Sequence, residues 1–291
     1  MIFIVRKRAL GDVIWVEPFL HYIINNNKGK RIFIYTKYPQ VFDHYPYRKL
    51  IVQENPKWYI KVLIRFLAKI KSNSCYILDD VYEEDPQKHF LQAFYDRFNI
   101  HDGYMHYPSL QHLLNAKKTV KRKQIVFHVN NTAIQLYRKI HGVNWGDIFQ
   151  HVHDLGFEIL LLNKPEEVVL QNKNIPITFF SGSLQELVNA VNESSYFVGL
   201  DSGPSHVAAS LKIPSLIFFG PVKPEYRHFI AEFRGYFLQS YCEKAGCYHI
   251  QPKWEQVCLL HEDQSIVPKC TIFNDTIVTT SINKLISNYE V

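Results

Sequence analysis

The sequence predicts an α/β protein made of two Rossmann-like lobes with a cleft between them. Short, fully apolar runs of strand length alternate with longer segments of helical period along most of the 291 residues. One polar, basic stretch, 115–124, interrupts this alternation, and the pattern restarts after it. A chain of this length more often forms two domains than one. We therefore expect one lobe over 1–120 and a second over 121–291.

In the first lobe, β-branched and aromatic runs predict strands, and each is followed by a turn or a charge. The segment 58–70 has helical period, with its apolar residues on one face and lysines and arginines around it. The expected strands are 2–6, 31–36, 50–52 and 76–80, and the expected helices are 13–24, 58–70 and 87–98.

The second lobe repeats the same alternation and ends in an amphipathic segment, 275–286, which predicts a terminal helix. The expected strands are 125–129, 158–162, 177–180, 196–200 and 215–219, and the other expected helices are 145–155, 164–171 and 184–192.

Composition excludes several classes of function. The apolar fraction of 47% and the charged fraction of 21% are typical of a globular chain. A net charge of +6 fits an anionic ligand or an anionic membrane surface and is too small to indicate nucleic acid. No apolar run reaches the roughly 18–20 residues of a membrane span, and the first residues lack a signal-peptide core. We expect a cytoplasmic protein, with peripheral contact to the inner membrane left open.

A strand–turn–helix motif at 196–211 is the strongest local signal. Asp201 and Ser202 follow an apolar run and can cap the next helix, while Gly203-Pro204 suits its first turn. A helix that begins in this way offers free backbone N–H groups and a positive dipole end, so it can hold a phosphate. An ordinary capped turn would have the same pattern, and both interpretations stay open on this stretch alone.

Two further places carry candidate chemistry. Gly11-Asp12 lies just after the first strand, where open α/β sheets place their ligands, although a simple helix cap fits as well. Arg138-Lys139 precedes the helix that begins at Trp145. A carboxylate base together with cationic phosphate binders suits transfer from a nucleotide-linked donor.

Two stretches of the chain resemble glycosyltransferase family 9, the heptosyltransferase family. The first is Arg8-Ala9-Leu10-Gly11-Asp12-Val13-Ile14 with Pro18, and the second is 197–209 followed by Pro214 and Phe219-Gly220-Pro221. Their order and separation also fit the family. The resemblance implies a B-type glycosyltransferase fold and an inverting transfer from a nucleoside-diphosphate sugar similar to ADP-heptose, without a metal in the chemistry.

The resemblance also implies residue roles. Asp12 would be the catalytic base, and Gly11 would lie beside it at the donor. Ser202, Gly203 and Pro204 would hold the diphosphate, with Asp201 and His206 near the sugar or phosphate. The remaining implied contacts are a phosphate-binding lysine and a carboxylate for the adenosine ribose, which correspond to Lys139 and to Glu166 or Glu167.

The chain departs from the family pattern in two places. Asn130-Asn131-Thr132-Ala133 stands where the family has small, glycine-rich residues. The spacing from Lys139 to Trp145 is one residue short, so Arg138 could be the equivalent cation. Both departures concern the donor's identity rather than the fold.

Four of the five cysteines cluster near the C-terminus, at Cys242, Cys247, Cys258 and Cys270. A cytoplasmic location argues against disulfides, and four thiols could form a tetrahedral metal site. The spacing C-x4-C-x10-C-x11-C lacks a close C-x2-C pair, so free thiols remain the alternative. Some members of the family carry such a cluster, and a protein-glycosylating subset holds iron there, so a structural zinc or iron is expected as one outcome.

Together these features predict an inverting glycosyltransferase that acts on a cell-envelope glycan or glycolipid such as lipopolysaccharide. Two alternatives stay open. The first is a nucleotide-sugar epimerase or hydrolase on the same fold. The second is a catalytically silent nucleotide-sugar-binding subunit that assembles through the cysteine segment.

Overall fold

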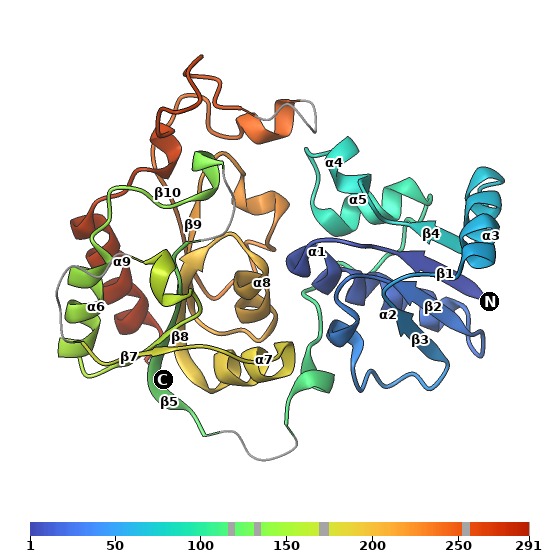
Figure 1. Ribbon diagram of the computed structural model, residues 1–291, viewed down its shortest axis with the longest axis horizontal. Coiled ribbons are helices and arrows are strands. Elements are labelled where there is room, and N and C mark those ends of the chain that lie inside the picture. The colour runs from blue at the N-terminus through green and yellow to red at the C-terminus, as the bar shows by residue number, and fades with distance from the viewer. Residues whose placement is uncertain (116–119, 131–134, 169–174, 252–256, 291) are drawn as a thin grey trace. The chain divides into compact units, whose positions relative to one another are not determined.

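The computed structural model describes residues 1–115, 120–130, 135–168, 175–251 and 257–290. By its internal contacts the chain divides into two compact units, Met1–Leu114 and Asn115–Val291, which Figure 1 colours from blue through green to red. Within the described ranges, no helix is both long and apolar enough to cross a membrane.

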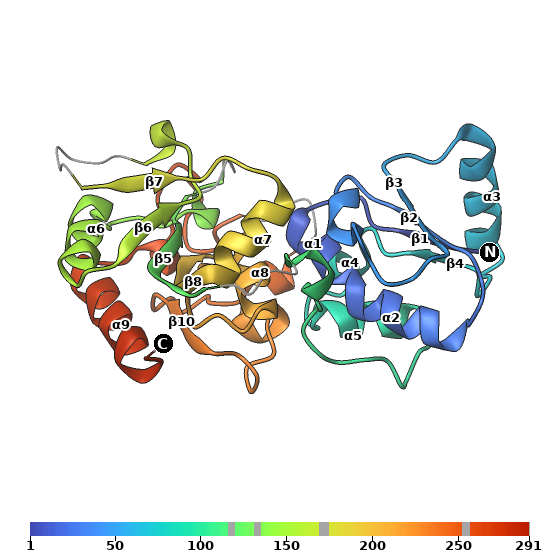
Figure 2. The same ribbon diagram turned by 90° about the horizontal axis from the view of Figure 1, so that it is seen from below.

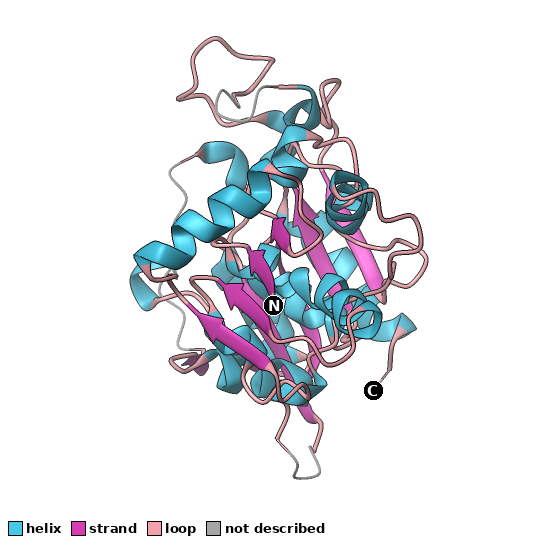
Figure 3. Ribbon diagram, turned by 90° about the vertical axis from the view of Figure 1, so that its right-hand side faces the viewer, coloured by secondary structure: helices cyan, strands magenta, loops and turns pink. Residues whose placement is uncertain are grey.

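The first unit is built on a four-stranded parallel sheet with the order β3-β2-β1-β4. In this sheet β1 (Ile2–Val5) lies between β2 (Ile32–Tyr35) and β4 (Cys75–Ile77), and β3 (Leu50–Gln53) is at the edge. Phe3 lies opposite both Phe33 and Cys75. The strands run side by side in the view that is coloured by secondary structure (Figure 3).

Helices cover the sheet of the first unit. Phe3, Val5, Tyr35 and Cys75 form a core with Ile64 of α3 (Trp58–Lys69). A second set of helices packs through aromatic rings. Phe19 of α2 (Val16–Asn26) stacks on Tyr95 of α5 (Phe90–Arg97), with the ring centroids 5.6 Å apart, within the range of about 4.5–7 Å that such pairs favour. The short α4 (Val81–Glu84) precedes α5.

The predicted helix 13–24 is two helices in the structure, α1 (Leu10–Ile14) and α2. Pro18 has no N–H to donate to the carbonyl group of Ile14, four residues earlier, so one continuous helix would lack this bond. Proline is tolerated in the first turn of a helix, and Pro18 is the third residue of α2. The break lets Gly11 and Asp12 belong to a separate short helix directly after β1.

The second unit contains a six-stranded, fully parallel sheet with the order β10-β9-β8-β5-β6-β7. Every residue of the central β8 is buried, as expected for a parallel strand covered on both faces. The strands are β5 (Arg122–His128), β6 (Glu158–Leu161), β7 (Ile177–Phe179), β8 (Ser194–Leu200), β9 (Ser215–Phe219) and β10 (Gly235–Gln239).

Helices cover both faces of this sheet (Figures 1 and 2). On one face, α6 (Trp145–Asp154) and α9 (Asp275–Asn288) pack against alternate residues of the strands to form the main core. On the other face lie α7 (Leu184–Glu193) and α8 (Gly203–Ser210). Parallel sheets in both units confirm the predicted α/β fold class.

Three local predictions differ from the structure. The basic residues 122–124 belong to β5 and not to a linker, while 116–119 lie outside the described residues. The predicted helix 164–171 is a single 3₁₀ turn at Pro165–Glu167, and its residues 169–171 are likewise not described. The half-exposed edge strand β10 was not predicted, because it begins with a glycine and ends with a glutamine.

Candidate functional site

The turn between β8 and α8 is the centre of the candidate site. The Asp201 N–H donates to the carbonyl of Phe218 at 3.1 Å, which ties the turn to β9. The Ser202 N–H donates to Ser205 Oγ at 3.1 Å, and that hydroxyl donates to the Ser202 carbonyl at 2.7 Å. Pro204 lies in the first turn of α8. The turn is therefore fixed by its own residues, and the start of α8 is held at the carboxyl end of the sheet.

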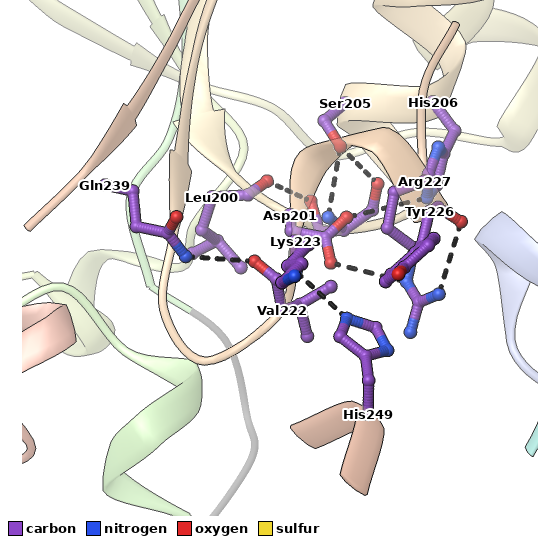
Figure 4. A network of polar contacts seen from close by, with 11 residues as sticks. Leu200, Asp201, Ser205, His206, Val222, Lys223, Tyr226, Arg227, Gln239 and His249 are labelled. Carbon is purple, nitrogen blue, oxygen red and sulfur yellow. Dashed lines mark hydrogen bonds and ion pairs between the residues drawn. The ribbon is translucent and has the colours of Figure 1, made fainter. Parts of the chain in front are cut away.

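Two buried basic side chains flank the Asp201 carboxylate (Figure 4). His206 Nε2 lies 3.7 Å from Oδ1, and Arg227 Nε lies 3.9 Å from Oδ2. Both contacts are longer than a hydrogen bond, and among the described residues Oδ1 makes none. Burial raises the pKa of Asp201, while Arg227 and then Arg138 act in the opposite direction. The carboxylate thus has an oxygen that a hydroxyl group of a ligand could satisfy.

A histidine pair extends this site away from the turn. The rings of His206 and His228 stack with centroids 4.9 Å apart and an interplanar angle of 24°. One ligand-type atom from each of Asp201, His206 and His228 lies within 4.8 Å of the others, a grouping that could hold a metal ion. The buried Arg227 guanidinium next to the same carboxylate opposes a second cation there. Its charge suits an anionic ligand better.

His128, at the end of β5, braces the turn from the neighbouring strand. Its Nδ1 lies 2.9 Å from Ser202 Oγ, and this hydroxyl donates to the Leu200 carbonyl at 3.1 Å. Burial lowers the pKa of His128 to about 4, so the ring is neutral at neutral pH. Gly199 allows this close approach, since a Cβ there would lie 2.7 Å from the His128 carbonyl oxygen.

The ends of β5 and β6 are joined by Asn163, which the sequence analysis did not single out. Its Oδ1 accepts from the N–H of Val129 at 2.8 Å, and its Nδ2 donates to the Asn130 carbonyl at 2.7 Å and to Glu167 Oε2 at 3.1 Å. Glu167 is therefore held by a hydrogen bond from Asn163, while the neighbouring Glu166 is exposed. Of the two candidate ribose ligands, Glu166 is the one whose carboxylate faces solvent.

The predicted phosphate-binding cations lie on a 3₁₀ turn at Leu136–Arg138 and directly after it. Arg138 is exposed, Lys139 is half-buried, and the charge of Arg138 acts on Asp201. The charge of Arg138 thus reaches the Asp201 carboxylate, although 63 residues separate the two in the sequence. Of the unusual stretch 130–133, only Asn130 lies within the described residues.

The predicted base lies in the first unit. Asp12 Oδ2 accepts from the Ala9 N–H at 2.9 Å and lies 2.8 Å from Arg6 Nη2. Both contacts use Oδ2, which leaves Oδ1 as the oxygen that can take a proton. The side chain is 18% exposed, so it remains accessible to solvent. Gly11 is buried beside it in α1.

Arg6 is another functional candidate that sequence reasoning missed. It is 2% exposed and also reaches Glu83 at 3.3 Å, the Leu78 carbonyl at 2.8 Å and the face of Tyr82 at 5.3 Å. Burial opposes its charge, but Asp12 and Glu83 outweigh burial and raise the pKa of Arg6. The only sequence signal was a charged residue at the end of an otherwise apolar strand.

The four C-terminal cysteines line one pocket, together with Tyr137, Tyr248 and Gln251. Cys247 and Cys270 are buried, and Cys242 and Cys258 are half-buried. Burial, reinforced by the other three thiols, raises the pKa of Cys270 to about 12. The four thiols have the donor chemistry of a structural zinc or iron site, but among the described residues no three of their sulfurs lie within 4.8 Å of one another.

Comparison with known proteins bears on this arrangement. A sequence model described as glycosyltransferase family 9 (heptosyltransferase) matches residues 107–248, just under half of the chain. The resemblance to family 9 is confirmed. The matched region contains the α8 turn, Arg138, Lys139 and Arg227.

A curated protein to which the chain is similar is the autotransporter heptosyltransferase Aah of Escherichia coli, 26% identical over 118 residues. That alignment covers 38% of this chain and 30% of Aah, so the matched stretch spans under a third of the relative's length.

Solved structures extend the likeness to the whole chain. The crystal structure of the iron-containing dodecameric glycosyltransferase TibC from enterotoxigenic E. coli has a TM-score of 0.71 at 14% identity, covering 99% of this chain and 76% of TibC. The E. coli heptosyltransferase WaaC with ADP has a TM-score of 0.59 at 13% identity, covering 98% and 99%. These similarities confirm the B-type glycosyltransferase fold.

Proposed function

We propose that the protein is an inverting glycosyltransferase that moves a heptose or similar sugar from a nucleoside-diphosphate donor to a hydroxyl of a cell-envelope glycan such as lipopolysaccharide. The observation that carries this proposal is the α8 turn, where Asp201 has an unsatisfied oxygen beside Arg227 and under the charge of Arg138. The ADP-heptose complex recorded for TibC supports the choice of donor.

In this mechanism Asp12 is the general base. Its carboxylate takes the proton of the acceptor hydroxyl as that oxygen forms a bond to the anomeric carbon of the sugar. The bond from the anomeric carbon to the diphosphate breaks at the same time, and the electron pair leaves with the diphosphate. Arg6 fixes the carboxylate by its 2.8 Å contact, so that the base is oriented before the acceptor binds.

The departing diphosphate gains negative charge, and the second unit supplies positive groups for it. The start of α8 at Ser202, Gly203 and Pro204 contributes its dipole, and Lys139 or Arg138 contributes a full charge. Asp201 and His206 would bind sugar hydroxyls or a phosphate oxygen. Glu166 would bind the ribose of the nucleotide, since its carboxylate is exposed at the end of β6.

A structural zinc or iron bound by Cys242, Cys247, Cys258 and Cys270 belongs to the same proposal. The description of TibC as iron-containing supports iron. The metal would crosslink a segment that is otherwise held by short 3₁₀ turns and glutamine side chains, and would supply folding free energy there. The proton transfer and the stabilisation of the diphosphate described above use this chain's own side chains.

The proposal places the protein where donor and acceptor meet, in the cytoplasm beside the inner membrane. The net charge of +6 supports contact with an anionic lipid surface. Nucleic acid has no part in it.

The test is incubation of the purified protein with ADP-heptose and with either truncated lipopolysaccharide or an autotransporter passenger protein as the acceptor. Mass spectrometry would measure sugar on the acceptor, and a coupled assay would measure free ADP. The proposal expects both products only when an acceptor is present. Release of ADP without an acceptor would instead indicate a hydrolase, and binding without turnover would indicate a silent binding subunit.

A further inference from the structure

The cysteine segment, 242–251 and 257–270, contacts the residues that flank the α8 turn. Its residues Tyr248 and His249 directly follow the buried Cys247 in a 3₁₀ turn at Cys247–Ile250. Neither is a cysteine, and neither has a role in the transfer reaction proposed above. Their side chains point at the loop after β9, residues 220–228, which carries Arg227.

Tyr248 connects the cysteine pocket with the Asp201 carboxylate. It lines the pocket, and the Arg227 guanidinium carbon lies 5.6 Å from the centroid of its ring. Within about 6 Å, a guanidinium over an aromatic face is attracted to it. The same Arg227, 4% exposed, reaches Asp201 Oδ2 at 3.9 Å. The ring thus sets where the guanidinium stands relative to the carboxylate.

The His249 side chain holds the backbone of the same loop. Its Nε2 accepts from the Lys223 N–H at 3.0 Å, as Figure 4 shows, and its ring meets Tyr226 edge-on with centroids 4.5 Å apart. Gly246 fits against this loop as well, since a Cβ on it would lie 2.5 Å from the Lys223 side chain. His249 is 3% exposed, so these contacts are made in the interior.

The other end of the cysteine segment contacts residues on either side of the predicted phosphate-binding cations. Tyr137, next to Arg138, lines the cysteine pocket. The 3₁₀ turn that contains Cys270 leads into a short parallel bridge, in which the His141 N–H donates to the Thr271 carbonyl at 2.9 Å. Segments on both sides of the candidate donor site therefore meet at the same cluster of thiols.

We propose that Tyr248 and His249 are positioning residues through which the cysteine cluster orders the donor site. Tyr248 orients Arg227 toward Asp201, and His249 anchors loop 220–228 through Lys223. This inference rests on the proposed function, because it gives the cluster its purpose in binding the nucleoside diphosphate. A donor site built from a loop and a 3₁₀ turn is precise only when its supporting groups hold it.

The test compares Tyr248→Leu and His249→Leu with the wild type, as purified. Tyr248→Phe keeps the ring face, and His249→Gln keeps an acceptor near the position of Nε2. Both variants should therefore bind ADP as the wild type does. Tyr241→Leu is the matched control, since Tyr241 directly precedes the same segment but is 87% exposed. Three quantities are measured: metal per chain, the Kd for ADP by calorimetry, and hydrogen exchange of residues 222–228.

We expect the two leucine variants to keep the wild-type metal content, to exchange faster at 222–228 but not in β5, and to bind ADP about 10-fold more weakly. The Phe, Gln and Tyr241 variants should match the wild type. Unchanged exchange and unchanged ADP affinity in both leucine variants would overturn the inference.

The two proposals fail in different ways. If the wild type binds no nucleotide but residues 222–228 still exchange faster in the leucine variants, the donor assignment is wrong and the positioning roles of Tyr248 and His249 are supported. If the wild type binds ADP and hydrogen exchange at 222–228 is the same in every variant, the positioning roles of Tyr248 and His249 are wrong and the donor assignment is supported.

Discussion

Each unit places one aspartate after a strand at the carboxyl edge of its sheet, and each aspartate has a buried arginine beside it, but the two pairs differ in tightness. Asp12 and Arg6 are 2.8 Å apart. Asp201 lies 3.9 Å from Arg227 and 3.7 Å from His206. Asp12 is held through Oδ2 by contacts of hydrogen-bond length to Arg6 and the Ala9 N–H, while Asp201 Oδ1 has no hydrogen bond among the described residues.

This difference matches the two roles proposed for the carboxylates. A base must be held in one orientation before the acceptor arrives, and a salt bridge of hydrogen-bond length does this. A ligand-binding carboxylate must keep hydrogen-bonding capacity for the ligand, and a loose ion pair leaves it available. The comparison therefore predicts that the same type of change will have different consequences in the two units.

The largest expected effect is on catalysis by Asp12→Asn. Removing the base should lower kcat for sugar transfer by about 10²–10⁴-fold and leave the Kd for ADP unchanged, because general-base catalysis contributes in this range. Steady-state assays with ADP-heptose would measure it. Asp102→Asn, a change at an exposed carboxylate that accepts from Tyr22 at 2.7 Å, is the control and should keep wild-type kcat.

The arginines offer the sharpest comparison of stability. Arg6→Met leaves Asp12 and Glu83 without their buried partner, and we expect the free energy of unfolding to fall by about 3–5 kcal/mol. Arg227→Met should cost less, about 1–3 kcal/mol, because Asp201 is held loosely, at 3.9 Å from Arg227. Urea unfolding of both variants measures this, and equal losses would contradict the distinction between the two pairs.

The stability of the second unit should depend on pH through His128. Burial lowers its pKa to about 4, below the ordinary value. Between about pH 6.5 and pH 4 the unfolded chain binds a proton that the folded chain does not, so stability falls as the pH falls through this window. Wild type should lose about 3 kcal/mol more than His128→Asn over this range. His153→Asn, on the exposed side of α6, should follow the wild-type curve.

The smallest expected effect is that of Ser202→Ala. This change removes the hydroxyl that lies 2.9 Å from His128 Nδ1 and donates to the Leu200 carbonyl at 3.1 Å, and losing such hydrogen bonds typically costs about 1 kcal/mol. Ser287→Ala, near the end of α9, serves as the control in the same unfolding measurement. A loss in the control as large as that at Ser202 would show that the Ser202 hydroxyl does not stabilise the turn specifically.

The sequence was sufficient for most elements of the fold because their signals are local. The apolar run 196–200 followed by Asp201 and Ser202 predicts a strand, a turn and a helix without knowledge of any other residue. Strand β10 escaped prediction because a half-exposed edge strand lacks the continuous apolar run of a buried one. The break between α1 and α2 depends on one missing N–H, at Pro18, inside an otherwise helical pattern.

The arginines and Asn163 could not be predicted because their roles depend on contacts far along the chain. Arg227 lies 26 residues beyond Asp201, and Arg6 meets Glu83 across 77 residues. Nothing in their neighbouring residues distinguishes them from solvent-exposed charges. The four cysteines were visible as a cluster in sequence, but only the structure brings all four to one pocket with Tyr248, the residue that links this pocket to Arg227.

A crystal structure of the protein with ADP would test the central claim most directly. The account predicts that the diphosphate lies at the start of α8, within hydrogen-bond distance of Ser202 or Gly203, with a positive group from Arg138 or Lys139 on the other side and the ribose near Glu166. Nucleotide bound elsewhere, with the α8 turn free of phosphate, would contradict it.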